Sequence, residues 1–256
     1  EPRVAIRMEG DSVGEVRGVN HRQELEPALL DIATQKYHSL PGGEKFDKKS
    51  EDMKKVTELA KKQEKNEHFN KDELAFLYEL NTPIEGFGYE KDPRVVELRG
   101  MRDTEADMPI LFDCAPEDIA HSVSKISEKT KAYVGKLEPG IFQKLPKNFE
   151  HVYTKFPEER VTFRSIELGT GIKDGPAFKQ AIEAQGMKIY SYAEQMLNNP
   201  DFRIVGEHKS AELVEVSVAA LGFEKWTMYA NICKRAEELG LALCPAEVGP
   251  QLRLQY

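Results

Sequence analysis

The chain has 256 residues, of which 40% are hydrophobic and 31% are charged, a composition typical of a globular protein with a buried core. Its 44 acidic residues outnumber its 36 lysines and arginines, and the formal net charge is −8. Nucleic-acid binding needs clustered Lys and Arg side chains that contact phosphates, so we do not expect a nucleic-acid partner. The sequence holds no apolar run of about eighteen residues, and we expect no membrane-spanning segment.

Residues 1–100 are predicted to form a hairpin followed by helices. Apolar and polar side chains alternate over residues 3–19 on both sides of a turn at Gly10, as in two antiparallel strands. The spacing of apolar residues predicts helices over 24–38 and 48–65. Lysines in the second helix are interleaved with acidic residues, which predicts a solvated face. A site for an acidic partner is the alternative.

A third helix is predicted to begin after Asn70. An N-cap residue followed three positions later by a glutamate, here Glu73, is the pattern of a capping box. Residues 81–108 are charged and contain several turn-forming residues. We predict an irregular boundary region there.

The central region, residues 101–205, contains a recurring pattern. Short apolar strands, each followed by a proline, are predicted at 109–114, 131–135 and 151–156. Their starts lie roughly twenty residues apart, which is typical of stacked strand–helix units. We therefore predict about two to three strand–helix repeats in this region.

Two helices are predicted after these repeats. Asp174 and Pro176 are suited to begin the first helix, and Gly186 is suited to end it. Ser191 and Glu194 form a second capping-box pattern, which predicts a short helix.

The C-terminal region, residues 206–256, is predicted to form a small β-α-β sheet. Apolar residues alternate over 213–218 and again over 252–256, as in strands. A helical stripe between them begins after Thr227 and ends at Gly240. Together with the hairpin and the repeats, this unit predicts the α+β fold class.

The residue types that bind metals or carry catalysis form no local motif. The histidines are scattered, and the three cysteines, Cys114, Cys233 and Cys244, have no metal-ligand spacing. We therefore expect no metal and no cofactor, and we assign no catalytic residue. Reduced thiols and a cytoplasmic location are expected, with a Cys233–Cys244 disulfide as the alternative. Because the chain begins at Glu1 rather than at a methionine, we expect targeting or other terminal segments to lie outside this sequence.

Two glycine-containing loops bear a partial likeness to phosphate-binding loops. A dinucleotide fingerprint needs a preceding strand, a third glycine and a following helix. The loop at 86–88 follows a predicted helix, and the loop at 169–171 lacks the Walker spacing. We predict a plain loop at the first position and a tight turn at the second.

Two resemblances extend this interpretation. Residues 145–158, with Leu-Pro before a short strand and Phe-Pro-Glu after it, resemble one unit of the bacterial leucine-rich repeats, which implies strands lining a concave, protein-binding surface. Motifs elsewhere, FLYE at 76–79, IEGFGY at 84–89 and KDPR at 91–94, are similar to uncharacterised bacterial proteins from lineages with reduced genomes. That second resemblance implies no activity and no site residues.

These observations predict a non-enzymatic protein-interaction module, whose partner is another protein bound by the repeat strands and their adjacent loops. The alternative is a hydrolase that assembles Cys114, His121 and His151 in space, because catalytic triads are not local in sequence. Cys114 also fits the role of a small buried hydrophobic residue. A nucleic-acid module is the third possibility and would need a lysine patch within 45–65.

Overall fold

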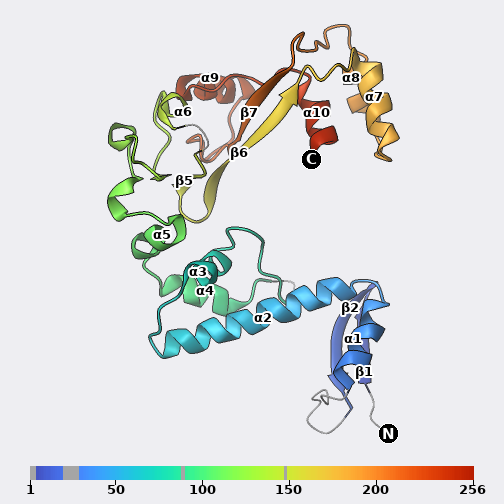
Figure 1. Ribbon diagram of the computed structural model, residues 1–256, viewed down its shortest axis with the longest axis vertical. Helices are drawn as coiled ribbons and strands as arrows, with labels where there is room; N and C mark the ends of the chain where they lie inside the picture. Colours follow the sequence, from blue (N-terminus) through green and yellow to red (C-terminus); the bar gives the residue numbers. More distant parts are fainter. Residues whose placement is uncertain (1–3, 20–28, 88–89, 147–148) are drawn as a thin grey trace. The chain divides into compact units, whose positions relative to one another are not determined.

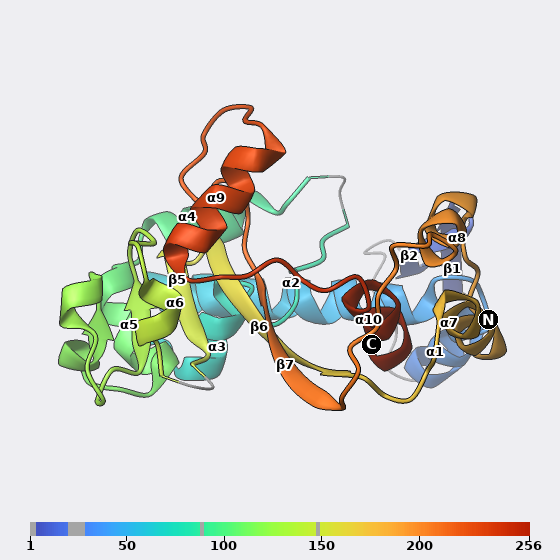
Figure 2. The ribbon, with the colours of Figure 1, turned by 90° about the horizontal axis from the view of Figure 1, so that it is seen from above.

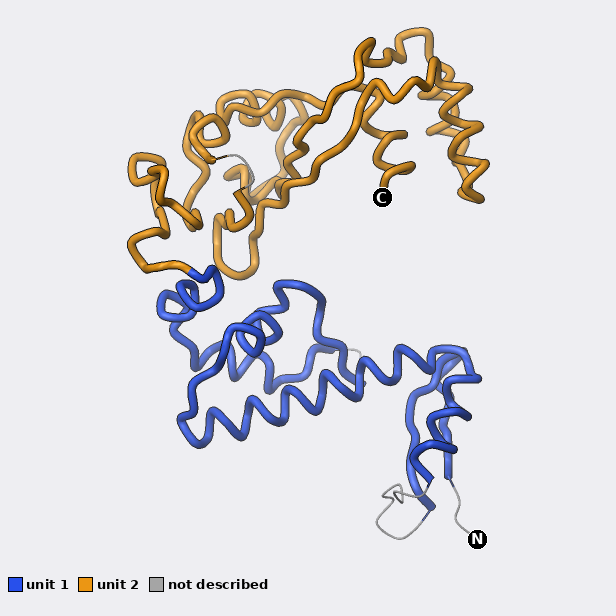
Figure 3. Tube along the Cα trace, viewed as in Figure 1, with its two compact units in different colours: residues 1–113 blue, residues 114–256 orange. Residues whose placement is uncertain are grey.

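The computed structural model describes residues 4–19, 29–87, 90–146 and 149–256. It divides into two compact units, unit 1 (residues 1–113) and unit 2 (residues 114–256), shown in Figure 3. Helices make up 42% of the structure, and strands, arranged in two sheets, make up 17%. This content confirms the predicted α+β class. The predicted division of the chain into three regions, with boundaries after residues 100 and 205, stays a prediction. Within the described ranges, no helix is both long enough and apolar enough to cross a membrane.

Unit 1 begins with the predicted hairpin. Strands β1 (Val4–Glu9) and β2 (Ser12–Gly18) pair antiparallel around a turn at Gly10, whose φ of 59° suits a glycine. The buried Val13 donates its backbone N–H to the carbonyl of Pro41 at 3.1 Å. This bond ties the hairpin to the loop between the first two helices.

Helices form the rest of unit 1 (Figure 1). They are α1 (Leu30–His38), α2 (Gly43–Glu64), α3 (Lys71–Leu77), α4 (Pro93–Gly100) and α5 (Thr104–Phe112). The first three correspond to predicted helices, although residues 24–28 of the first prediction lie outside the described residues. Val56 and Leu59 of α2 are buried, as the apolar stripe of that helix predicts.

The capping box at α3 is confirmed. The Asn70 side chain accepts the Glu73 backbone N–H at 2.9 Å, and the Glu73 carboxylate accepts the Asn70 N–H at 2.9 Å. Lys62 of α2 also donates to Glu73, at 2.6 Å. Although partial burial opposes it, hydrogen bonds from Lys62 and from the Asn70 N–H lower the pKa of Glu73.

Replacing Asn70 with alanine is therefore expected to destabilise α3 by about 1 kcal/mol, because the Glu73 N–H loses its acceptor. Hydrogen exchange of the α3 amides measures this loss. Asn70→Ser keeps a side-chain acceptor and should exchange like the parent chain. Equal protection in the alanine and serine variants would contradict the assigned role.

The prediction of an irregular region over 81–108 is wrong from residue 93 onward, where α4 and α5 form. Two aspartates explain both helix starts. The Asp92 side chain accepts the Arg94 N–H at 3.0 Å, with Pro93 at the first helical position. Asp103 caps α5 in the same way, accepting the N–H of Glu105 at 3.1 Å.

The predicted strand at 109–114 is also wrong, because its apolar run continues α5. Met108, Leu111 and Phe112 are buried at helical spacing. Pro109 within this helix removes one hydrogen bond near its first turn, a loss that the burial of these three side chains offsets. A short apolar run of this kind fits a strand and a buried helix equally well.

Unit 2 is built on a five-stranded sheet in the order β3-β4-β5-β6-β7. The strands are β3 (Ile119–Ala120), β4 (Ala132–Val134), β5 (His151–Lys155), β6 (Glu159–Leu168) and β7 (Lys209–Glu215). The first three pair in parallel, with Ile119, Ala132 and His151 in register, and the remaining pairs are antiparallel. The predicted strands at 131–135 and 151–156 are thus confirmed as β4 and β5. The first parallel strand is β3, which replaces the one expected at 109–114.

Among the described residues, five α-helices accompany this sheet. They are α6 (Ile141–Lys144), α7 (Gly175–Ala184), α8 (Ser191–Leu197), α9 (Tyr229–Leu239) and α10 (Val248–Gln255). Asp174 caps α7 through the Ala177 N–H at 2.8 Å, and Gly240 ends α9 with a φ of 95°, both as predicted. The second capping box is wrong: α8 forms, but its N-cap is Tyr190 and no side chain caps it.

The predicted strand at 252–256 is wrong, so the C-terminal region is not a β-α-β sheet. These residues lie mostly in α10, and β7 pairs with β6 instead. A polar stripe explains the helix: Glu247, Gln251 and Gln255 are four residues apart and bond to the end of β6 and the loop after it. In a strand these three side chains would share a face but lie about 13 Å apart from one to the next, whereas a helix places them on successive turns about 6 Å apart, close enough to reach one short stretch of chain.

The β6–β7 ribbon has a different cover on each face. Phe163 and Val214 of one face pack into the core that contains Tyr133 and Val152. Ile166 and Leu168 of β6 pack against Val248 in α10. Figures 1 and 2 both show α9 and α10 at different places along this ribbon.

Candidate functional site

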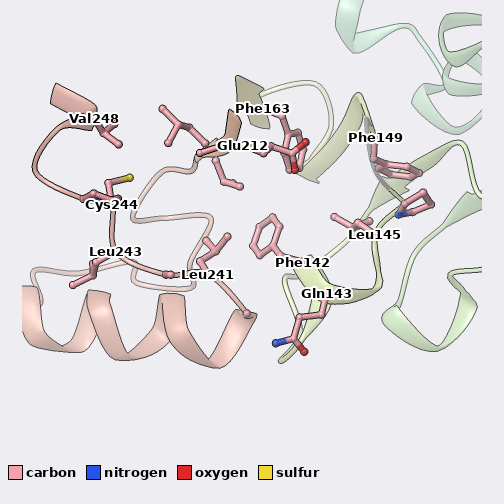
Figure 4. Close-up of a pocket in the computed structure, with 17 residues that line it drawn as sticks. Phe142, Gln143, Leu145, Phe149, Phe163, Glu212, Leu241, Leu243, Cys244 and Val248 are labelled. Carbon is pink, nitrogen blue, oxygen red and sulfur yellow. The ribbon is translucent and has the colours of Figure 1, made fainter. Parts of the chain in front are cut away.

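A cavity of about 510 Å³ lies in unit 2 beside β7. Its walls come from α6 and the loop that follows, from β6 and β7, and from the segment joining α9 to α10 (Figure 4). Most lining side chains are apolar. The lining residues are Phe142, Gln143, Leu145, Pro146, Phe149, Phe163, Ala211, Glu212, Leu213, Val214, Gly240, Leu241, Ala242, Leu243, Cys244, Pro245 and Val248.

The strand register sets which side chains share this cavity. Phe163 of β6 lies directly opposite Val214 of β7, and Glu212 is two positions from Val214, on the same face. Phe142 from α6 completes the arrangement, with its ring centroid 6.3 Å from that of Phe163 and the ring planes at 64°. Figure 4 shows both rings and the Glu212 side chain at the same hollow.

Hydrogen bonds between α6 and α9 hold the wall formed by the two helices. Gly140 at the start of α6 donates to the Glu238 carbonyl at 2.9 Å. Arg235 of α9 donates to the carbonyls of Leu137 at 2.7 Å and Leu221 at 3.2 Å. At Gly240 an added Cβ would lie 2.9 Å from the Gln143 side chain, so α6 and the end of α9 are closely packed.

Of the described residues that line the cavity, Glu212 alone carries a charged side chain. Its carboxylate is exposed, and among the described residues it forms no ion pair and no hydrogen bond. The cavity therefore combines an apolar, aromatic lining with one available negative charge.

In the described part of the chain, β7 is the last strand of the sheet and has a neighbouring strand only on its β6 side. In an antiparallel pair, alternate residues direct their backbone N–H and C=O groups toward and away from the partner strand. The outward groups of β7 have no hydrogen-bond partner in the part of the chain that the structure describes. A seven-residue edge is thus available for pairing with another strand.

Two cysteines lie near this site. Cys244 is exposed in the cavity wall, Cys233 is half-buried on α9, and no disulfide joins them. A hydrogen bond with Cys233, together with the nearby Cys244 thiol, raises the pKa of Tyr229. The alternative of a Cys233–Cys244 disulfide is therefore not realised in this structure.

The residues of the hydrolase hypothesis lie at different places in unit 2. Cys114 is half-buried before β3, His151 is half-buried at the start of β5, and His121 is exposed just after β3. The His121 Nδ1 lies 2.9 Å from the Val134 carbonyl oxygen. Because β4 lies between β3 and β5, the Cα atoms of the two histidines are about 10 Å or more apart. The hydrolase hypothesis stays a prediction.

The loop at 169–171 holds a carboxylate of the chain itself. The Gly169 N–H donates to Glu247 at 2.8 Å, and the Val205 N–H donates to the same carboxylate at 2.8 Å. Glu247 is fully buried. A phosphate has no access to this amide while Glu247 occupies it. The plain loop predicted at 86–88 includes residue 88, which lies outside the described residues.

Within the described ranges, no group of three or more His, Cys, Asp and Glu side chains is arranged to hold a metal ion.

The leucine-rich-repeat resemblance over 145–158 coincides with β5. The parallel ladder stops at this strand, because the next strand, β6, pairs with it antiparallel. No protein-family model, curated protein or solved structure matches this chain.

Proposed function

We propose that this chain binds an extended segment of another protein, which adds a strand to the outer edge of β7. The observation that carries the proposal is the seven-residue edge of β7, whose outer side pairs with no described strand and is bordered by an apolar cavity. In this mode of recognition, backbone hydrogen bonds supply affinity and alternate side chains of the segment enter pockets and supply specificity.

The proposed surface differs from the predicted one. The repeat strands β4 and β5 each have a neighbouring strand on both sides, so neither offers a free edge. Their faces are occupied as well, because Tyr133 and Tyr153 are buried. The protein-binding prediction is therefore kept, and the binding surface moves from the repeat strands to β7.

Proline replacement at two adjacent edge positions tests this proposal. Of Ser210 and Ala211, one directs its N–H toward β6 and the other directs it outward. Proline at the outward position removes only the donor that an added strand would use. We expect one of Ser210→Pro and Ala211→Pro to fold like the parent chain and to lose peptide binding, while the other destabilises the β6–β7 ladder by about 3 kcal/mol.

The probe is a phage-displayed library of random linear peptides, selected on the full chain. Selected peptides should alternate apolar and polar residues and should protect outward β7 amides from hydrogen exchange. Peptides that bind the well-folded proline variant as tightly as the parent chain would contradict strand addition, as would a selection that yields none.

A further inference from the structure

Building on the proposed strand addition at β7, we infer that the cavity selects a Lys or Arg side chain at one position of the bound segment. The juxtaposition that carries this inference is the available carboxylate of Glu212 beside the rings of Phe142 and Phe163. The partner is therefore a basic, extended segment of another protein.

The charge of the cavity supports a cationic occupant. Among the described lining residues, Glu212 is the only Asp, Glu, His, Lys or Arg, and most of its neighbours are Phe, Leu and Val side chains. The carboxylate is exposed and has no partner among the described residues, so a cation can reach it without displacing an existing bond. The negative net charge of the chain adds attraction at longer range.

The two aromatic rings favour the same sign of charge. The face of a phenylalanine ring carries negative electrostatic potential, and Lys and Arg side chains bind over it. Phe142 and Phe163 meet at 64° and so present differently oriented ring surfaces to the hollow. An ammonium or guanidinium group beside Glu212 can contact a ring and the carboxylate together.

The geometry of strand addition would bring a Lys or Arg side chain of the bound segment next to Glu212. A residue paired with Glu212 in an added antiparallel strand would have its Cβ about 5 Å from the Glu212 Cβ, on the same face of the sheet. That face is the one on which Phe163 and Val214 lie. The aliphatic stem of a Lys or Arg side chain would cover apolar lining such as Leu241 while its charged end meets Glu212.

The matched variants are Glu212→Gln and Glu215→Gln. Both remove one negative charge from β7, but Glu215 lies on the opposite face and pairs with Arg164 at 3.5 Å. Peptides selected on the parent chain should carry Lys or Arg at one fixed position. Glu212→Gln is expected to weaken their binding about tenfold, and Glu215→Gln to leave it within about twofold.

A second probe tests the cation site without any peptide. Butylammonium, which mimics a lysine side chain, should shift the NMR signals of the Phe142 and Phe163 rings in the parent chain and in Glu215→Gln, but not in Glu212→Gln. Neutral pentanol should show no dependence on Glu212.

The outcomes separate the two proposals. Selected peptides that bind β7 without a basic position, together with no effect of butylammonium, would overturn the cation site and leave strand addition standing. A Glu212-dependent response to butylammonium without any peptide binding would overturn strand addition and support the cation site alone. Equal effects of Glu212→Gln and Glu215→Gln would overturn the specific role of Glu212.

Discussion

Replacing Asp107 with alanine should destabilise unit 1 by about 4 kcal/mol, because the change leaves a largely buried arginine without its counter-ion. Asp107 is 1% exposed. It accepts the Tyr78 hydroxyl at 2.7 Å and the Arg102 Nε at 2.9 Å, and a second Arg102 nitrogen pairs with its other oxygen. The Arg102 guanidinium also lies over the Phe69 ring, 4.7 Å from its centroid.

The three residues depend on one another. Burial and the hydrogen bond to Asp107 raise the pKa of Tyr78, so the phenol stays a neutral donor to the carboxylate. Without the carboxylate, Tyr78 would lose its acceptor and Arg102 its charge partner, both in a poorly solvated site.

Hydrogen exchange of the α3 and α5 amides measures this effect within the full chain, and protection should fall by about a thousandfold. Asp103→Ala is the control, since it removes an acid from the exposed start of the same helix and should cost about 1 kcal/mol. A cost at Asp107 no greater than that at Asp103 would show that the buried network contributes nothing beyond a helix cap.

Glu247→Ala is expected to destabilise unit 2 by about 3 kcal/mol. The fully buried carboxylate accepts the backbone N–H groups of Gly169 and Val205, each at 2.8 Å, and the Gln251 amide at 2.9 Å. Alanine leaves two half-buried backbone donors without an acceptor, and the loss of an acceptor for a shielded donor costs about 1–3 kcal/mol.

Hydrogen exchange of the Gly169 and Val205 amides measures the loss of these bonds directly, and both amides should exchange faster in Glu247→Ala. Glu247→Gln keeps one acceptor oxygen but places an N–H₂ donor against a backbone N–H, so its effect should be intermediate. Gln255→Ala is the control, because that side chain bonds Glu167 at an exposed position where water replaces it. Full protection of both amides in Glu247→Ala would contradict the role assigned to the carboxylate.

The candidate site could not be predicted from the sequence, and its components show why. Glu212 is one of many acids and lies in a stretch of alternating polar and apolar residues, where a solvated surface role is the ordinary expectation. Phe142, Phe163 and Leu241 come from three distant segments. Only the β6–β7 register and the packing of α6 against α9 bring them to one hollow.

The turns and helix ends that the sequence alone predicted are those set by interactions between residues close together in the chain. The turn at Gly10, the capping box of Asn70 and Glu73, and the stop at Gly240 each depend on residues within a few positions of one another. Strands β4 and β5 were predictable because their apolar residues are bounded by turn-forming residues.

Tertiary structure decided which of the remaining segments became helices and which became strands, because a short apolar run is compatible with both. The run at 108–112 and the alternation at 252–256 are both compatible with strands, yet both segments are helical. In α5, Met108, Leu111 and Phe112 find a core at helical spacing, and in α10 the buried bonds of Glu247 are formed only with the distant Gly169 and Val205. Likewise, which strand would form a free edge depended on the pairing of β7 with β6, a contact between segments more than forty residues apart.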